Sequence, residues 1–363
     1  MAHEISRESF FDASGKPAWH TLDVMNKLGL IREDRDYFAP EVFGYLGKPD
    51  YSMSPMFALD PDGNQIEIGD YTIFRHPVDD DPQYRAIGKA SEHYELVAAK
   101  HAVDLWQQHI ELPVATMMML RNDGVMVITA ELPQYDVKGE QVNSYLVFTN
   151  GMDGRTATRS DVSDVRVVCA NTLRRAQRSS QQNFVVHHTS GSIERLTGWM
   201  ATVVERATFQ RDVNREVYDI LAETPFDSEQ VRWIAGTVYR DPAKPRKDFA
   251  YKEGYAHALD VYEKGMERVE MKRDNLLKLF TQNTAIGFQD NPLSGTAWHA
   301  LNSVTQDLTH GVTSSFNARA ESLVIGDRAS TIEAVTDTII QIAGRENPEL
   351  LKVVNQEFEP VLV

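Results

Sequence analysis

The sequence predicts an α+β protein in which strands dominate the first half and helices the second. Three observations support this prediction. Short β-rich runs separated by Gly, Asn and Asp turns occupy residues 51–190. Apolar residues recur at helical spacing from residue 191 onward. Hydrophobic residues make up 42% and charged residues 25% of the chain, which is the composition of a folded globular protein.

The chain length predicts more than one structural unit, because 363 residues exceed a typical single domain. We expect an N-terminal segment over residues 1–50, an α+β core domain over 51–190 and a helical domain over 191–363. The N-terminal segment is irregular in pattern, apart from a short predicted helix at Leu22–Leu28. The core is expected to contain an N-terminal helix followed by an antiparallel β-meander.

Two strands joined by a tight turn are predicted at the start of the core. Met53–Leu59 and Ile66–Phe74 are β-rich, and the segment Asp60-Pro61-Asp62-Gly63-Asn64 between them is a strong turn signal. The acidic run at residues 79–82 follows. Three adjacent carboxylates without further oxygen ligands are typical of a solvated turn rather than of a cation site.

A helix and a three-stranded meander come next. Glu95–His109 has apolar residues near helical spacing. Val114–Leu120 and Val125–Leu132 flank an Asn-Asp-Gly turn, which predicts a hairpin. Val142–Thr149 is apolar on both faces and is expected to be central. The three methionines 117–119 are compatible with an adaptable binding surface, but the equally apolar partner strand favours strand core.

A strand–helix–strand unit is predicted after the meander. Val165–Cys169 forms the first short strand, and Asn183–His188 forms the second. Asn171 or Thr172 can cap a helix that runs to about Arg178.

Helices are predicted over the rest of the chain. One apolar face continues from Ile193 to Leu221, and a connection interrupted by Pro242 and Pro245 breaks the later series. The further expected helices are 228–238, 254–280, 295–310, 328–344 and 347–358.

The net charge of -16 argues against a generally DNA-coating protein, because an acidic chain repels bulk nucleic acid. It is compatible with one local basic groove, since screening confines a patch to about 8 Å. The lone Cys169 permits no intramolecular disulfide, the N-terminus lacks a signal-peptide pattern, and no stretch approaches roughly 18 apolar residues. We therefore expect a cytoplasmic protein with no membrane segment.

No catalytic centre is predicted. Cys169 precedes a predicted helix and lies near arginines, as a reactive thiol would, but its alternation with Val165 and Val167 favours a buried structural thiol. His187 and His188 are adjacent in a strand and point to opposite faces, so they cannot share one metal ion. We expect no enzyme activity, no metal and no cofactor.

One block of arginines is positively charged, although the chain as a whole is strongly acidic. Residues 155–178 contain six arginines, two aspartates and no lysine. Arginine favours bidentate recognition of phosphate, and Arg174 and Arg178 would share one helix face. Internal pairing with this protein's own carboxylates is an equally strong interpretation. The predicted nucleic-acid contacts in this block are Arg155, Arg159, Arg166, Arg174, Arg175 and Arg178.

A second basic cluster lies in the proline-interrupted connection. Basic and aromatic residues that alternate on a connection can bind single strands, although a solvated loop is the more frequent explanation. The cluster contains Lys244, Arg246, Lys247 and Lys252, interleaved with Phe249 and Tyr251.

Four segments resemble a known family. They are Pro17-Ala18-Trp19-His20, the run from Phe148 to Gly154, the run from Val165 to Leu173 with His188-Thr189, and the run from Gly295 to Asn302 with His310. The sequence is similar in these segments to the phage/plasmid-like protein family, family nine-three-two among the domains of unknown function. Gln306 and Thr309 depart from it, since the family tends to have acidic side chains there.

The resemblance implies carriage on bacteriophages, plasmids or integrative elements. At the level of fold alone, the order helix, β-meander, helix resembles the core of single-strand annealing recombinases of the Rad, Erf and RecT type, which form rings or filaments. This implies a homo-oligomeric protein that binds and anneals single-stranded DNA without a catalytic residue. The alternative is a non-enzymatic acidic protein that acts on a host factor, and a cysteine-dependent enzyme ranks last.

Overall fold

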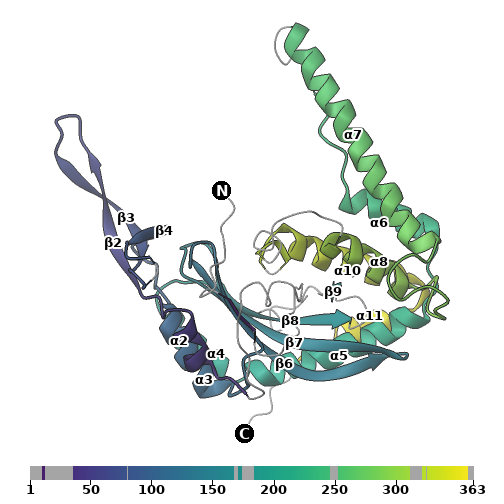
Figure 1. Ribbon diagram of the computed structural model, residues 1–363, viewed down its shortest axis with the longest axis horizontal. Helices are drawn as coiled ribbons and strands as arrows, with labels where there is room; N and C mark the ends of the chain where they lie inside the picture. Colours follow the sequence, from purple (N-terminus) through teal and green to yellow (C-terminus); the bar gives the residue numbers. More distant parts are fainter. Residues whose placement is uncertain are drawn as a thin grey trace.

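An antiparallel sheet lies at the centre of the molecule (Figure 1). The computed structural model describes residues 10–12, 36–79, 81–166, 171–173, 184–245, 252–310, 321–323 and 325–358. Within these ranges the sheet has seven strands in the order β1-β5-β6-β7-β8-β10, and β9 also pairs with β8. The strands are β1 (Phe10–Asp12), β5 (Thr116–Leu120), β6 (Val125–Val137), β7 (Glu140–Gly151), β8 (Thr158–Arg166), β9 (Asn171–Leu173) and β10 (Phe184–Val186).

Both faces of this sheet are buried, because successive strand residues alternate between two hydrophobic clusters. Met117 and Met119 belong to one cluster and Met118 to the other, and all three are almost fully buried. This confirms the prediction that the methionines are strand core.

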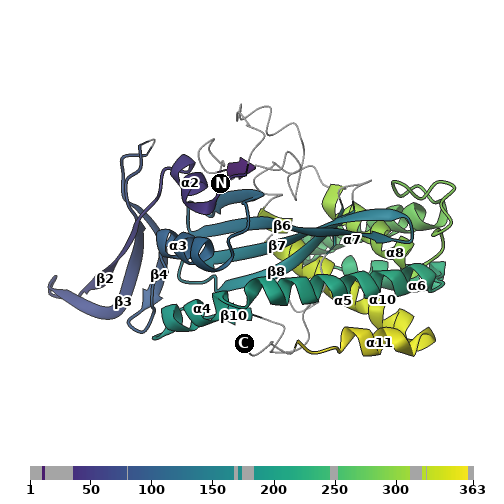
Figure 2. The same cartoon turned by 90° about the horizontal axis from the view of Figure 1, so that it is seen from below.

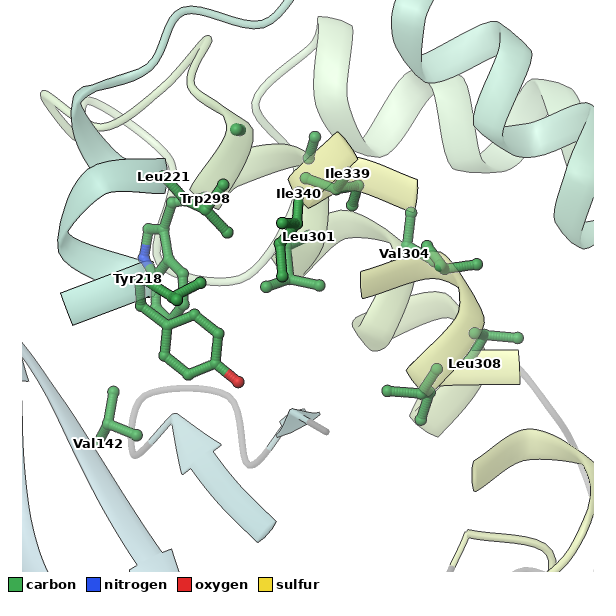
Figure 3. Packing of buried hydrophobic residues seen from close by; sticks show 14 of the residues in the cluster. Val142, Tyr218, Leu221, Trp298, Leu301, Val304, Leu308, Ile339 and Ile340 are labelled. Carbon is green, nitrogen blue, oxygen red and sulfur yellow. The ribbon is translucent and has the colours of Figure 1, made fainter. Parts of the chain in front are cut away.

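Helices pack against both faces of the sheet (Figure 2). The first cluster is shared with α2 (Ala39–Tyr45), α3 (Ala99–His109) and α4 (Ser192–Met200), and with Val203 and Ala207 in the first turns of α5 (Val203–Glu223). The second is shared with helices of the C-terminal half, and Figure 3 shows Tyr218 of that layer between Val142 of β7 and Trp298, with Ile340 beside Leu301 further along the cluster. The C-terminal helices are α5 (Val203–Glu223), α6 (Ser228–Val238), α7 (Lys252–Thr281), α8 (Ala297–His310), α10 (Asp327–Glu346) and α11 (Pro348–Val354).

A second sheet extends from one end of the molecule as an arm (Figure 1). It consists of β2 (Tyr51–Leu59), β3 (Gln65–Arg75) and β4 (Arg85–Ser91), in that order. Because β4 pairs only with residues 70–75 of β3, the distal part of the β2–β3 hairpin is two-stranded. Asp60 closes its turn by accepting hydrogen bonds from the N–H groups of Asp62 (2.9 Å) and Asn64 (2.8 Å).

Helix α7 forms a second arm at the other end of the molecule (Figure 1). The connection that follows α6 packs along it. Arg273 of α7 donates to the carbonyl oxygen of Tyr239 (2.9 Å) and pairs with Asp241 (2.8 Å). Gly265 faces Pro242, which leaves little room for a side chain at position 265. Among the described helices, none is both long and apolar enough to cross a membrane.

The fold class is confirmed as α+β, with strands early and helices later. Helix α6 has the predicted bounds, whereas the predicted helix at Glu95–His109 begins only at Ala99. The prediction that a helix begins at residue 171 or 172 is wrong, because residues 171–173 form the strand β9. The expected helix at 22–28 lies outside the described residues, and the proposed domain boundaries stay a prediction.

Candidate functional site

The loop between β7 and β8 is held closed by the carboxylate of Asp153. This side chain is buried and accepts hydrogen bonds from the N–H groups of Arg155 (3.0 Å) and Thr156 (2.7 Å), and from the Thr156 hydroxyl (2.9 Å). A Cβ at Gly154 would lie 2.1 Å from the carbonyl oxygen of Lys89, and Gly154 has a φ of +71°. The Asp-Gly pair of the family-like segment is therefore explained by loop geometry and by the contact with β4.

A buried polar relay joins two of the family-like segments. The Thr158 hydroxyl lies 2.6 Å from Oδ1 of Asn150 and 2.9 Å from Nε2 of His188, and Nδ2 of Asn150 donates to the carbonyl oxygen of Val97 (2.9 Å). Because Oδ1 can only accept, Thr158 donates to it. Nε2 of His188 must then carry the proton and donate to Thr158.

The position of His188 keeps its imidazole neutral. Burial lowers the pKa of His188 to about 4, and the ring of Tyr94 stacks on it at 5.2 Å. His187 is exposed while His188 is buried, but β10 ends at Val186, so neither histidine lies in the strand that was predicted to hold both. Within the described ranges, no three His, Cys, Asp or Glu side chains are grouped so that they could hold a metal ion.

Glu95 ties α4 to the segment that precedes α3. Its carboxylate accepts hydrogen bonds from the Ser192 N–H (2.6 Å) and hydroxyl (2.9 Å) at the first turn of α4. Partial burial opposes ionisation of Glu95, but these bonds outweigh it and lower the pKa of the carboxyl. Tyr94, Glu95 and Thr158 were missed by sequence reasoning, since a single polar residue beside an apolar run carries no local signal of its distant partner.

The junction between the two sheets is rich in arginine, and most of these arginines are neutralised. Arg75 is 1% exposed and pairs with Asp81 and with Asp123 (3.3 Å). Arg121 pairs with Glu321 (2.9 Å) and lies 3.5 Å from Asp153. The acidic run at residues 79–82 thus supplies a partner for a buried guanidinium, and its carboxylate Asp81 also pairs with Arg85.

The structure describes only part of the predicted arginine block. Arg159 is 30% exposed and pairs with Asp161 at 3.3 Å, as the internal-pairing interpretation expects. Arg155 is exposed and forms no ion pair with a carboxylate of the described residues. The backbone of Arg166 lies in β8, opposite Val142. The side chain of Arg166, together with Arg174, Arg175, Arg178 and Cys169, falls outside what the structure describes.

The second basic cluster lies on the helical arm. Lys244 is exposed, and Arg240, which sequence reasoning did not single out, is exposed four residues before it. Neither forms an ion pair with a carboxylate of the described residues, whereas Asp241 between them is bound by Arg273. Lys272 lies over the ring of Tyr239 at 5.3 Å. Arg246 and Lys247 fall outside the described residues.

Exposed aromatic and charged groups continue from this cluster onto α6. Trp233 is 60% exposed. Beside it, Arg232 and Gly236 of α6 line a hollow of about 290 Å³ together with Glu270, Arg273, Asp274 and Leu277 of α7. Trp233 follows the exposed Arg232 in the helix, and an exposed aromatic side chain of this kind is one on which a base could stack.

The last family-like segment is structural. Nε1 of Trp298 donates to Glu140 of β7 (2.7 Å), which also accepts from Asn291 (2.7 Å). Gln306 accepts the N–H of Ile286 (2.7 Å). These contacts hold α8 and the loop before it against β7. The geometry therefore supports a packing role for these residues.

One comparison with known proteins identifies a family. No curated protein matches the sequence and no solved structure matches it. The model of the family described as a domain of unknown function, DUF932, matches residues 86–334, which is well over half of the chain and includes the central sheet from β5 to β10, the relay at His188 and the helical arm. The chain therefore belongs to the DUF932 family.

Proposed function

We propose that the chain is a protein of a phage or plasmid that binds and anneals single-stranded DNA as a homo-oligomer, without a catalytic residue. The observation that carries this proposal is a pair of exposed cations on the helical arm, neither of which pairs with a carboxylate of the described residues. Arg240 and Lys244 are exposed, and the acid between them, Asp241, is held by Arg273. Residues 240–252 contain five basic and two acidic side chains in a protein of charge -16.

Aromatic residues on the same arm favour a single strand over a duplex. Trp233 is exposed on α6, and Phe249 and Tyr251 follow in the basic sequence. Bases of a single strand are free to stack on such rings, whereas bases of a duplex are already stacked on one another. The acidic body disfavours wrapping of nucleic acid around the whole protein, so contact would be confined to the arm.

The arginine block supports the proposal less strongly. Arg159 is paired with Asp161, and the neighbouring junction arginines are also paired. Removing such an arginine would leave a carboxylate without its partner rather than delete a phosphate contact. Arg155 is the exposed exception, and Arg174, Arg175 and Arg178 stay predicted contacts.

A gel-shift titration with a short DNA single strand tests the proposal. We predict that Arg240→Ala/Lys244→Ala weakens binding at low salt and reduces the salt slope by about 1.4, because each phosphate contact on a single strand contributes about 0.7. The matched control is Lys100→Ala/Lys352→Ala, which removes the same charge from two lysines that pair within their own helices. Equal binding by both double variants would place the contact elsewhere.

The acidic hairpin arm favours a second candidate function. Its distal part is apolar and lacks any basic residue, which suits a protein partner rather than nucleic acid. A non-enzymatic protein that acts on a host factor would use such a surface. Failure of the wild-type protein to bind a single strand even at low salt would favour this second function.

A further inference from the structure

The two arms carry most of the exposed apolar surface. Of the eleven large apolar side chains that are exposed among the described residues, four lie in the distal β2–β3 hairpin and two on α7. We name the hairpin tip as residues 56–59 and 65–69. It exposes Phe57 by 54%, Leu59 by 71%, Ile66 by 51% and Ile68 by 45%. They form two apolar pairs, Phe57 with Leu59 on one face of the hairpin and Ile66 with Ile68 on the other. Exposed apolar pairs that no other element of the chain covers are typical of interaction surfaces.

The hairpin tip is incomplete as a structure on its own. It has only two strands, and each strand has one unpaired edge because β4 reaches no further than Asp70. Phe57 and Leu59 share one face of the hairpin with their cross-strand partners Glu67 and Gln65. Ile66 and its partner Ala58 lie on the other face. A two-stranded ribbon in water is only marginally stable, so contact with another surface would stabilise it.

The charge of the hairpin tip restricts what can cover it. From Tyr51 to Phe74 there is no lysine or arginine, but there are four acids, of which Asp70 is paired with Lys89. Asp60 closes the turn. Asp62 and Glu67 are exposed and stay available. The complementary surface must therefore be apolar and basic.

Helix α7 offers such a surface on the same chain. Its positions 261, 264, 268, 271 and 272 share one side of the helix at 100° per residue. We name this side the basic face of α7; its members are Val261, Lys264, Arg268, Met271 and Lys272. Val261 is 55% and Met271 58% exposed, and Arg268 is exposed without an ion pair to any described carboxylate. The acids of the helix at 263, 267, 270 and 274 lie on a different flank. Asp260 borders the basic face and pairs with Lys264 (2.8 Å), and Lys272 lies over the ring of Tyr239.

We propose that the hairpin tip of one copy docks on the basic face of α7 of a second copy. The two arms extend from opposite ends of the molecule (Figure 1, Figure 2), so the hairpin tip does not reach the α7 of its own chain. The two surfaces differ from each other and lie far apart. Such a head-to-tail contact repeats and produces a ring or a filament. The inference deepens the oligomer part of the proposed function and is independent of nucleic acid.

A charge-exchange experiment tests this contact without nucleic acid. The tip variant is Asp62→Lys/Glu67→Lys and the helix variant is Lys264→Glu/Arg268→Glu. Light scattering over a concentration series should give a mass above one chain for the wild type and the mass of one chain for each variant alone. Mixed in equal amounts, the two variants should recover the wild-type mass, because every tip then meets a helix of opposite charge.

The control is Lys100→Glu/Lys352→Glu, which carries the same charge change as the helix variant and should keep the wild-type mass. Lys100 pairs with Asp104 within its helix, as Lys264 pairs with Asp260. Circular dichroism checks that each variant is folded. A wild type that stays a single chain at all concentrations overturns the inference, as does a variant that keeps the wild-type mass or a mixture that does not recover it. Since these measurements contain no DNA, they can fail while the gel-shift result stands.

Discussion

At position 188 a neutral histidine occupies a buried site between the Thr158 hydroxyl and the ring of Tyr94. Its pKa of about 4 lies below the value of about 6.5 that an unfolded histidine has. Above about pH 6.5 both states are neutral and this group adds no pH dependence. As pH falls toward 4 the unfolded state binds a proton that the folded state does not, so stability is lost.

We predict that the free energy of unfolding falls by up to about 3 kcal/mol through this one group between pH 6.5 and 4. In His188→Gln the amide can still donate to Thr158 but does not titrate. Urea unfolding of both proteins at several pH values isolates the contribution, since the other histidines are common to both. Parallel pH profiles for the two proteins would contradict the assigned role of His188.

At the scale of elements, the prediction succeeded wherever local patterning determines the structure. The Asp60–Asn64 turn, the meander and α6 follow from turn chemistry and apolar periodicity. It failed at residues 171–173, where Asn171 and Thr172 suit a helix cap but the free edge of β8 offers backbone partners instead. The strand Arg85–Ser91 and most of β8 were also missed, because small and polar residues dilute their β signal.

In the β7–β8 loop, the close approach of β4 requires a glycine at position 154. We predict that Gly154→Ala destabilises the protein by about 3 kcal/mol or more, since the left-handed conformation costs about 1–2 kcal/mol and the Cβ also meets the Lys89 carbonyl oxygen. Gly63→Ala is the matched control. Its φ is +85°, but a Cβ there meets nothing within 4 Å, so only the conformational cost applies. Thermal unfolding of both variants distinguishes the two contributions, and equal losses would remove the packing argument.

At the scale of the whole molecule, the candidate surfaces lie on the two projecting arms (Figure 1). Sequence reasoning identified Lys244 because clustered charge is visible in one dimension. It could not find the Arg273–Asp241 pair, which joins α7 to the connection and takes up the acid between Arg240 and Lys244. The sequence also predicted Arg159 as a phosphate contact. Asp161 is visible in the same block, but the sequence alone does not show that the two side chains pair. Long-range pairing decides which charges are free.

The salt dependence of single-strand binding measures how many of these charges touch phosphate. The five basic residues between 240 and 252 set an upper limit of about 3.5 for the slope if the stretch 240–252 of one chain is the whole site, at about 0.7 for each contact. We predict a slope at or below this limit when it is measured on a strand short enough to bind one chain. A steeper slope requires phosphate contacts outside this stretch, and the arginine block is then the next source. Arg174→Ala/Arg178→Ala would in that case flatten the slope by about 1.4, while Arg155→Ala/Arg159→Ala would change it less because Arg159 is already paired.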